Sequence, residues 1–183
     1  MAVGIRLAEA SDADQMLEIY APVVRDTAIS FELTAPTKSE FRERIQNTLR
    51  QRPWLVYESD GRILGYAYAG PFRTREAYQW AGEVTVYVDA TSHRGGVGRA
   101  LYASLLECLR LQGYCRAIAV ITLPNPASVG LHEHIGFRSV GVLNDIGYKL
   151  GKWHDVGWWQ LDLQESVPSP SEPKPVTELV GSE

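Results

Sequence analysis

Residues 83–102 constrain the fold of this chain more than any other stretch. Positions 84–88 are β-branched or aromatic throughout, which predicts a strand. A glycine-rich loop follows, and leucines at helical spacing from Leu101 to Leu109 predict a helix after it. Such a turn presents free backbone N–H groups at the positive end of a helix dipole, which favours a phosphate or pyrophosphate. The stretch therefore predicts a strand, loop and helix that bind a phosphorylated ligand.

Three kinds of phosphate loop compete for this segment, and a simple tight turn is the alternative to all of them. A Walker A loop is disfavoured because Arg99 follows Gly98 where Lys is required. A Rossmann loop is disfavoured because Leu101 stands where the third glycine belongs. The third kind is the pyrophosphate loop of acyl-coenzyme A acetyltransferases. Residues 93–98 resemble it, except that His93 stands where Gln or Arg is usual.

The composition is that of one globular domain. The chain has 183 residues, 45% hydrophobic and 22% charged, with a formal net charge of −4. This charge disfavours a nucleic-acid partner, and no apolar run approaches the roughly 18 residues that would cross a membrane. The N-terminus lacks a signal-peptide pattern. We expect Cys108 and Cys115 to be reduced thiols in a cytoplasmic protein.

The remaining pattern predicts the order β-α-α-β-β-β-α-β-α-β-β. Ser11 and Asp14 have the spacing of a capping box that opens the first helix, Asp60-Gly61 predicts a hairpin, and Pro126 suits a first helical turn. We expect a single α+β domain over 1–164, with a mixed sheet and helices on both faces. The Pro- and Ser-rich part of segment 165–183 predicts an extended or disordered tail. An extended segment is also expected at 29–33.

Short motifs follow one another in a fixed order: PWLV at 53–56, AYAGP at 67–71, TVYV at 85–88, LPN at 123–125 and GKWHDVG at 151–157. Together they resemble the phosphinothricin acetyltransferases of the GNAT superfamily, whose relatives acetylate methionine sulfoximine and methionine sulfone. The resemblance covers residues 5–163. It implies a GNAT-type fold, with a mostly antiparallel central sheet whose fourth and fifth strands splay apart, and it implies a homodimer.

The resemblance also implies acetyl-CoA as the donor. The backbone of Val86, Tyr87 and Val88 is expected to pair with the pantetheine arm as an added strand would. Asn125 and His134 fall near the cofactor in this comparison. The expected pyrophosphate loop consists of Arg94, Gly95, Gly96, Val97, Gly98 and Arg99, whose arginines add charge to the backbone amides.

Acetyl transfer to an amine needs a base, a polarised carbonyl and a proton for the leaving thiolate. Glu83 begins the predicted cofactor strand and matches the glutamate that the family is thought to use, so we expect it to be the base; the alternative is a solvated strand end. His132 occupies the place of a tyrosine that can protonate the leaving sulfur in many GNAT enzymes; the alternative is a packing role. The run 132–134 does not suit zinc, because positions i and i+2 of a helix point to different sides, and no metal is expected.

An acceptor carboxylate needs a positive counter-charge. Arg73, Thr74 and Arg75 lie just before the Glu83 strand, where two arginines at i and i+2 of an extended loop can form a bidentate clamp. The resemblance places this loop at the substrate carboxylate, and a solvated basic loop is the alternative. The resemblance also places Phe31 close to the substrate side chain, with a core role as the alternative, and backbone contacts to the substrate are expected from Val84 and Thr85.

These features predict an enzyme that acetylates the α-amino group of phosphinothricin, methionine sulfoximine or methionine sulfone, with a role in detoxification. One alternative is an acetyltransferase for a polyamine or a protein N-terminus, which the arginine loop disfavours. A second is an acyl-CoA-binding module without turnover, which the presence of Glu83 and His132 disfavours. The expected partners are a small amino acid, acetyl-CoA and a second copy of the chain.

Overall fold

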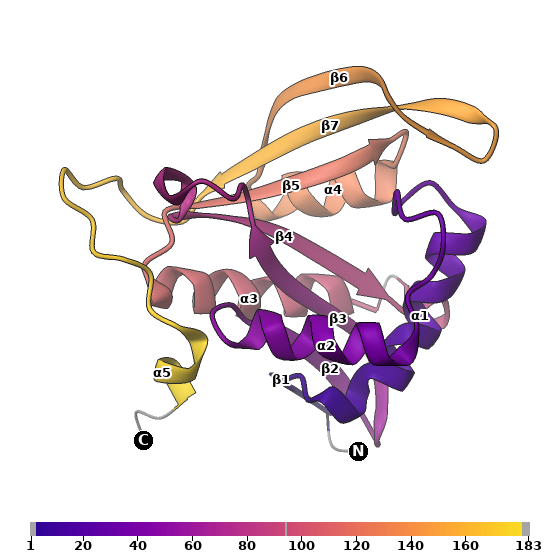
Figure 1. Cartoon of the computed structure of the whole chain (residues 1–183), viewed down its shortest axis with the longest axis horizontal. Helices are drawn as coiled ribbons and strands as arrows, with labels where there is room; N and C mark the ends of the chain where they lie inside the picture. The colour runs from indigo at the N-terminus through magenta and orange to yellow at the C-terminus, as the bar shows by residue number, and fades with distance from the viewer. Residues whose placement is uncertain (1–2, 94, 181–183) are drawn as a thin grey trace.

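The structure, a computed structural model, describes residues 3–93 and 95–180, which fold around one seven-stranded sheet (Figure 1). The predicted order of strands and helices is confirmed, and so is the GNAT-type arrangement. The strands are β1 (Val3–Leu7), β2 (Trp54–Ser59), β3 (Arg62–Pro71), β4 (Ala81–Val88), β5 (Arg116–Leu123), β6 (Arg138–Lys149) and β7 (Lys152–Asp162). The helices are α1 (Ala13–Asp26), α2 (Lys38–Leu49), α3 (Val97–Gln112), α4 (Pro126–Ile135) and α5 (Val176–Val180), with short 3-10 turns η1 (Ala10–Asp12), η2 (Glu76–Tyr78) and η3 (Ala90–Ser92).

The sheet order is β1-β2-β3-β4-β5-β7-β6, and every neighbouring pair is antiparallel except β4 and β5. Those two strands are parallel and pair only over Ala81–Glu83 and Arg116–Ile118. Beyond Glu83 they separate, as Figure 1 shows for the magenta and pink strands. The predicted splay of the fourth and fifth strands is therefore confirmed, and it starts at Glu83.

Two hydrophobic clusters cover the two faces of the sheet. The face under α3 is mostly aliphatic, with fully buried Leu101 and Leu105 packed on small strand residues such as Ala67. The face under α1 and α2 is aromatic, and Trp54 lies 5.9 Å from Tyr66 between ring centroids. Because successive strand residues point to opposite faces, the central strands β2, β3 and β4 contribute to both clusters.

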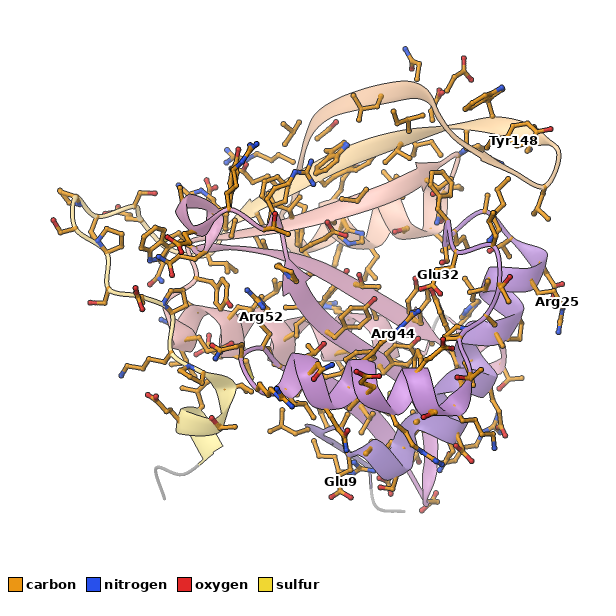
Figure 2. The ribbon with its side chains drawn as sticks, viewed as in Figure 1. Glu9, Arg25, Glu32, Arg44, Arg52 and Tyr148 are labelled. Atoms are coloured by element: carbon orange, nitrogen blue, oxygen red, sulfur yellow. The ribbon has the colours of Figure 1, made fainter. Side chains whose placement is uncertain are left out.

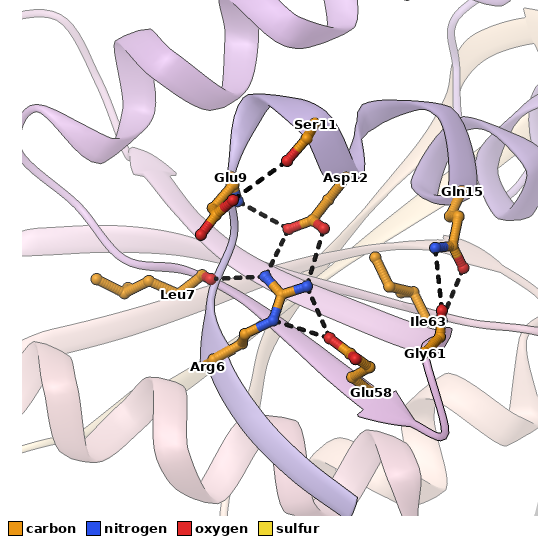
Figure 3. Close-up of polar contacts among 9 residues, drawn as sticks. All are labelled: Arg6, Leu7, Glu9, Ser11, Asp12, Gln15, Glu58, Gly61 and Ile63. Carbon is orange, nitrogen blue, oxygen red and sulfur yellow. Dashed lines mark hydrogen bonds and ion pairs between the residues drawn. The ribbon is translucent and has the colours of Figure 1, made fainter.

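The helix α1 begins at Ala13 as predicted, but the residues that cap it differ from the prediction. The expected capping box of Ser11 and Asp14 is wrong, because the Asp12 carboxylate accepts the backbone N–H of Glu9 at 2.8 Å instead (Figure 3). Asp12 also accepts two hydrogen bonds from the Arg6 guanidinium, at 2.7 and 2.9 Å. The hydroxyl of Ser11 is used elsewhere, donating to the Glu9 carboxylate at 3.2 Å. A part-buried arginine–carboxylate contact thus places the capping box at η1, and α1 follows directly from Ala13.

Two further segments refine the predicted organisation. Residues 29–33 form an irregular loop between α1 and α2, without the regular extended pairing of a strand. The C-terminal segment has no regular helix or strand over 166–175. It is held by hydrogen bonds such as that from Gln112 Nε2 to the Lys174 carbonyl at 2.6 Å, and the short helix α5 then buries Val176. Among the described residues, no helix is long and apolar enough to span a membrane.

Candidate functional site

A cavity of about 300 Å³ opens where β4 and β5 separate. Residues 83–87 of β4 and 119–122 of β5 form its walls, the loop at 29–31 closes one side, and Tyr102 and His132 line it from α3 and α4. Since side chains alternate along each strand, this cavity takes groups from both faces of the sheet. It therefore connects the α1/α2 side with the α3/α4 side through the gap in the strand pairing.

Glu83 stands at the edge of this gap, as the last β4 residue that pairs with β5. Burial raises the pKa of its carboxyl above the ordinary value, and the positive charge of Arg73 opposes that shift. A carboxylate with a raised pKa is a stronger base than one in water. The position and environment of Glu83 thus suit it to accept a proton inside the cavity.

The arginine loop lies beside the cavity without lining it. The Arg73 guanidinium rests 5.1 Å from the Trp158 ring centroid and 4.7 Å from that of Phe72, so two aromatic rings fix its position. Thr74 and Arg75 are exposed at the start of η2. Arg73 is therefore the member of the expected clamp whose charge reaches Glu83, and a joint role of Arg73 and Arg75 stays a prediction.

His132 is a buried residue of α4, only 3% exposed. Its Nδ1 lies 2.7 Å from the Ser128 carbonyl oxygen and its Nε2 lies 2.9 Å from the Tyr102 hydroxyl. Because a carbonyl can only accept, Nδ1 carries the proton, and Nε2 accepts from Tyr102. Burial lowers the pKa of His132, which keeps the ring neutral. Both ring nitrogens are engaged in hydrogen bonds, and His132 lines the cavity next to Tyr102.

Tyr102 is the cavity residue that the sequence analysis did not single out. It lies in the leucine-rich stripe of α3 and is fully buried. A signal was available, because a buried tyrosine needs a hydrogen-bond partner for its hydroxyl. The partner, His132, comes from another helix, however, and only the folded chain brings the two together. Tyr20, Ser30 and Tyr68 line the same cavity and were also missed.

The start of α3 has backbone donors that no side chain of the described residues caps. The helix begins at Val97 after Gly96, whose φ of +80° is in the left-handed region and which provides no side-chain cap. In this turn the Ala100 N–H donates to the Gly96 carbonyl at 3.0 Å. The N–H groups of Val97, Gly98 and Arg99 thus belong to the uncapped first turn. Arg94 lies outside the described residues.

The edge of β4 provides a second set of backbone groups. Val86, Tyr87 and Val88 pair with β3 on one side, while their pairing with β5 has already ended at Glu83. A Cβ placed on Gly98 would touch Leu131 at 3.4 Å and Val88 at 3.5 Å, so the loop glycine brings β4, α3 and α4 close together. An open strand edge that leads to a helix N-terminus fits a ligand with amides in an arm and phosphates at its end.

Comparisons with known proteins agree with this geometry. Residues 5–158 match the family model of the acetyltransferase (GNAT) domain. The chain belongs to the GNAT acetyltransferase family. Membership of this family makes it an acyltransferase. The gap between β4 and β5 lies in the middle of its sheet.

The relatives are similar over nearly their whole length. A phosphinothricin N-acetyltransferase of Streptomyces viridochromogenes is 40% identical over 178 residues, which is 97% of this chain and 96% of that protein. An L-methionine sulfoximine/L-methionine sulfone acetyltransferase of Pseudomonas aeruginosa is 32% identical, covering 93% of this chain and all of that one (100%). Among solved structures, a phosphinothricin acetyltransferase of Sinorhizobium meliloti in complex with acetyl-CoA superposes with a TM-score of 0.89 at 32% identity, over 95% and 96% of the two chains.

Of the other predicted site residues of this GNAT chain, some line the cavity and one does not. Asn125 lines the cavity, and its Oδ1 caps α4 by accepting the Ser128 N–H at 3.1 Å. Phe31, Val84 and Thr85 also line the cavity. His134 is exposed on α4 and does not line it. The described residues contain no cluster of His, Cys, Asp and Glu that could hold a metal ion.

A second hollow, of about 230 Å³, lies between Trp80, Cys115 and the C-terminal segment. Its Arg116 donates to the Cys115 and Gln164 carbonyls and to the Ser166 hydroxyl, at 2.7 to 3.0 Å. These bonds tie the C-terminal segment to β5.

Proposed function

We propose that this GNAT enzyme transfers the acetyl group of acetyl-CoA to the α-amino group of phosphinothricin-like L-amino acids. The acceptors are phosphinothricin, methionine sulfoximine and methionine sulfone. The observation that carries this proposal is the half-buried Glu83 at the origin of the splay, with the Arg73 charge beside it. The relatives with these named activities support the acceptor class.

Glu83 takes one proton from the acceptor's ammonium group, directly or through a water, so that the nitrogen can form a bond to the acetyl carbon. Acetyl-CoA supplies the acetyl group as a thioester, whose C–S bond breaks. The nitrogen gives up two protons in total, one through Glu83 to solvent and one that ends on the sulfur. The raised pKa of the Glu83 carboxyl brings it closer to the pKa of an α-amino group, near 8 or above, which favours proton transfer between them.

Tyr102 provides the hydrogen-bond donor for the departing sulfur. Burial raises the pKa of its hydroxyl strongly, so the group stays protonated throughout the reaction. In the absence of the reacting sulfur, this O–H points to His132 Nε2. We propose that it turns to the developing negative charge, and that His132 holds Tyr102 in place through the Nδ1 bond to Ser128.

The donor is held by backbone groups on the α3/α4 side. We propose that Val86, Tyr87 and Val88 bind the pantetheine arm, and that the amides of residues 95–99 bind the pyrophosphate. The supporting features are the open edge of β4 and the uncapped first turn of α3. Asn125, whose amide nitrogen faces no partner in the described chain, contributes a donor, and His134 is kept as an outer contact of the cofactor.

The acceptor is held on the α1/α2 side. Arg73 and Arg75 pair with its carboxylate and Thr74 completes the loop, while Phe31 and Thr85 form the wall beside its side chain. The backbone next to Val84 is available in the same gap. We further propose a detoxifying role in the cytoplasm, which agrees with two free cysteines in the described chain.

Thiol release during turnover tests the acceptor class. The panel contains phosphinothricin, methionine sulfoximine, methionine sulfone, a polyamine and an alanyl peptide. We expect turnover with the three free amino acids and little with the polyamine, because it has no carboxylate for Arg73. If none of the three releases CoA above the hydrolysis background, the proposal fails.

We also propose that the enzyme is a homodimer. The β6–β7 hairpin projects at the edge of the sheet (Figure 1), and its exposed apolar residues are what a partner copy would cover. Light scattering is expected to give twice the chain mass of 20.4 kDa. A monomer mass at micromolar concentration would overturn this assignment. The apolar residues are Val140, Val142, Leu143, Ile146, Tyr148, Leu150 and Trp153.

A further inference from the structure

We propose that the β6–β7 hairpin sets the position of Phe31, and that Gly147 and Lys149 are therefore positioning residues for the acceptor. This inference rests on the proposed function, because Phe31 matters only if the cavity binds an acceptor side chain. The hairpin comes from the end of the domain and the Phe31 loop from its beginning, and the two meet at one wall of the cavity.

Gly147 leaves the space that the Phe31 ring occupies. A Cβ on Gly147 would lie 2.0 Å from Phe31 Cε2 and 2.3 Å from Cζ. Any side chain here would displace the ring, since real Cβ contacts do not fall below about 3 Å. The backbone of Gly147 is not left-handed, so the need for glycine comes from the ring. Across the hairpin, Gly147 pairs with His154, whose ring centroid is 6.2 Å from that of Phe31.

Lys149 fixes the backbone on which Phe31 is carried. Its ammonium is buried and donates to two carbonyls, those of Val24 and Ser30, each at 2.6 Å. Val24 lies in the last turns of α1, where a cation meets unsatisfied carbonyls and the negative end of the helix dipole. The Lys149 carbonyl in turn accepts from His154 Nε2 at 3.0 Å. One buried lysine thus ties α1, the loop and the hairpin together.

The opposite side of the loop is held by α1 and α2. The Tyr20 hydroxyl bonds to Ser30 Oγ at 2.8 Å and to the Glu32 carboxylate at 3.0 Å. Glu32 also pairs with Arg44 of α2, and Figure 2 shows the two side chains facing each other. Ser30 and Glu32 are therefore anchored on either side of Phe31, a residue that is 39% exposed. The hairpin supplies the remaining constraint, which is where that ring points.

A double-mutant cycle tests the contact between Gly147 and Phe31. We expect Gly147→Ala to raise the acceptor KM about 10- to 100-fold, because displacing a wall by about 1 Å is costly for positioning. The KM for acetyl-CoA is expected to stay within about twofold. In a Phe31→Ala background, which removes the whole ring including the Cδ2 that lies 2.8 Å from that Cβ, the same change should alter the acceptor KM less than about threefold. Gly141→Ala, on the same strand and facing open space, is the matched control.

Lys149→Met supplies a second, independent variant, with Lys152→Met as its control. Lys152 pairs with Lys149 across the same hairpin but is exposed. We expect a higher acceptor KM for Lys149→Met alone, and a changed ranking between phosphinothricin and methionine sulfone. Thermal unfolding of every variant identifies any that fail to fold. If Gly147→Ala fails to fold, the comparison of Lys149→Met with Lys152→Met tests the inference instead, and the reverse holds if Lys149→Met fails.

The outcomes separate the two claims. A wild-type enzyme that acetylates amino acids, together with an equal effect of Gly147→Ala in both backgrounds, overturns this inference alone. An equal rise in the KM for acetyl-CoA and for the acceptor also overturns it. A wild-type enzyme that acetylates none of the acceptors overturns the proposed function, and this inference with it.

Discussion

In the proposed function the two sides of the central sheet bind two different ligands, and the two sides differ in the residues that line them. The α3/α4 side is aliphatic and offers backbone groups at the β4 edge and the first turn of α3. The α1/α2 side is aromatic and offers hydroxyls and charges, including those of Tyr20, Glu83 and Arg73. A donor that is the same for a whole family can be held by backbone, whereas an acceptor must be distinguished by side chains.

The two sides also differ in how far apart in the sequence their residues lie. The donor side comes mainly from consecutive residues 83–102. The acceptor side joins residues that are more than 100 positions apart, as Lys149 and Ser30 show with a sequence separation of 119. This contrast predicts that variants will divide into those that change acetyl-CoA binding and those that change acceptor binding, with Glu83 at the boundary.

Glu83→Gln is expected to have the largest effect. Loss of a general base lowers kcat/KM by about 10²- to 10⁴-fold. The KM values for both ligands should change little. Steady-state kinetics from pH 6 to 9 measure this, with Glu76→Gln in the exposed η2 turn as the control. Unchanged turnover would remove Glu83 as the base.

The same variant should be more stable than the wild type at alkaline pH. Burial raises the folded-state pKa of Glu83 above its unfolded value. Its contribution to stability is therefore complete below the unfolded pKa and is lost as pH rises through the folded pKa. Glutamine has no charge to desolvate, so thermal unfolding at pH 8 should favour the variant. This result would also show that lost activity is not lost folding.

Arg73→Met comes next, and it addresses the acceptor side alone. Loss of a charge-assisted hydrogen bond should raise the acceptor KM about 10- to 100-fold, with little change in the KM for acetyl-CoA. Since the Arg73 charge lowers the pKa of Glu83, its removal should move the acidic limb of the kcat/KM profile to higher pH. Arg50→Met, at an exposed position after α2, is the control. An unchanged acceptor KM would contradict the assignment of this loop.

Tyr102→Phe tests the contact between the two sides. We expect kcat to fall about 10-fold, because a hydrogen bond to developing charge on sulfur is lost, while both KM values remain close to those of the wild type. His132→Gln should lower kcat by a similar or smaller factor. If His132 acts through Tyr102, the double variant should be no worse than Tyr102→Phe. Additive losses would give His132 a separate role. Tyr57→Phe on β2 is the control.

The features that the sequence predicted are those encoded locally. The hairpin at Asp60-Gly61 and the helix that starts at Pro126 are both confirmed, because a few neighbouring residues define each turn. The splay of β4 and β5 came from family resemblance and is also confirmed. Tyr102 and Gly147 could not be recognised in this way. The role of Tyr102 depends on its contact with His132, which lies 30 positions away. The role of Gly147 depends on its contact with Phe31, which lies 116 positions away. The capping box failed for a related reason, since Arg6 recruits Asp12.

Gly96→Ala should have the smallest effect, and it lies wholly on the donor side. Gly96 has a φ of +80°, where an L-residue costs about 1–2 kcal/mol, although a Cβ there would meet no neighbouring atom. For a chain of this length, that free energy corresponds to a melting temperature lower by about 2–8 °C. Any relaxation of the turn re-aims the N–H groups of Val97 and Gly98, so the KM for acetyl-CoA should rise a few-fold. The acceptor KM should not change, because Phe31 and Arg73 do not depend on this turn. Gly4→Ala, which also faces open space but without a positive φ, is the control. A variant that changed the acceptor KM instead would show that the two sides of the sheet are coupled through α3.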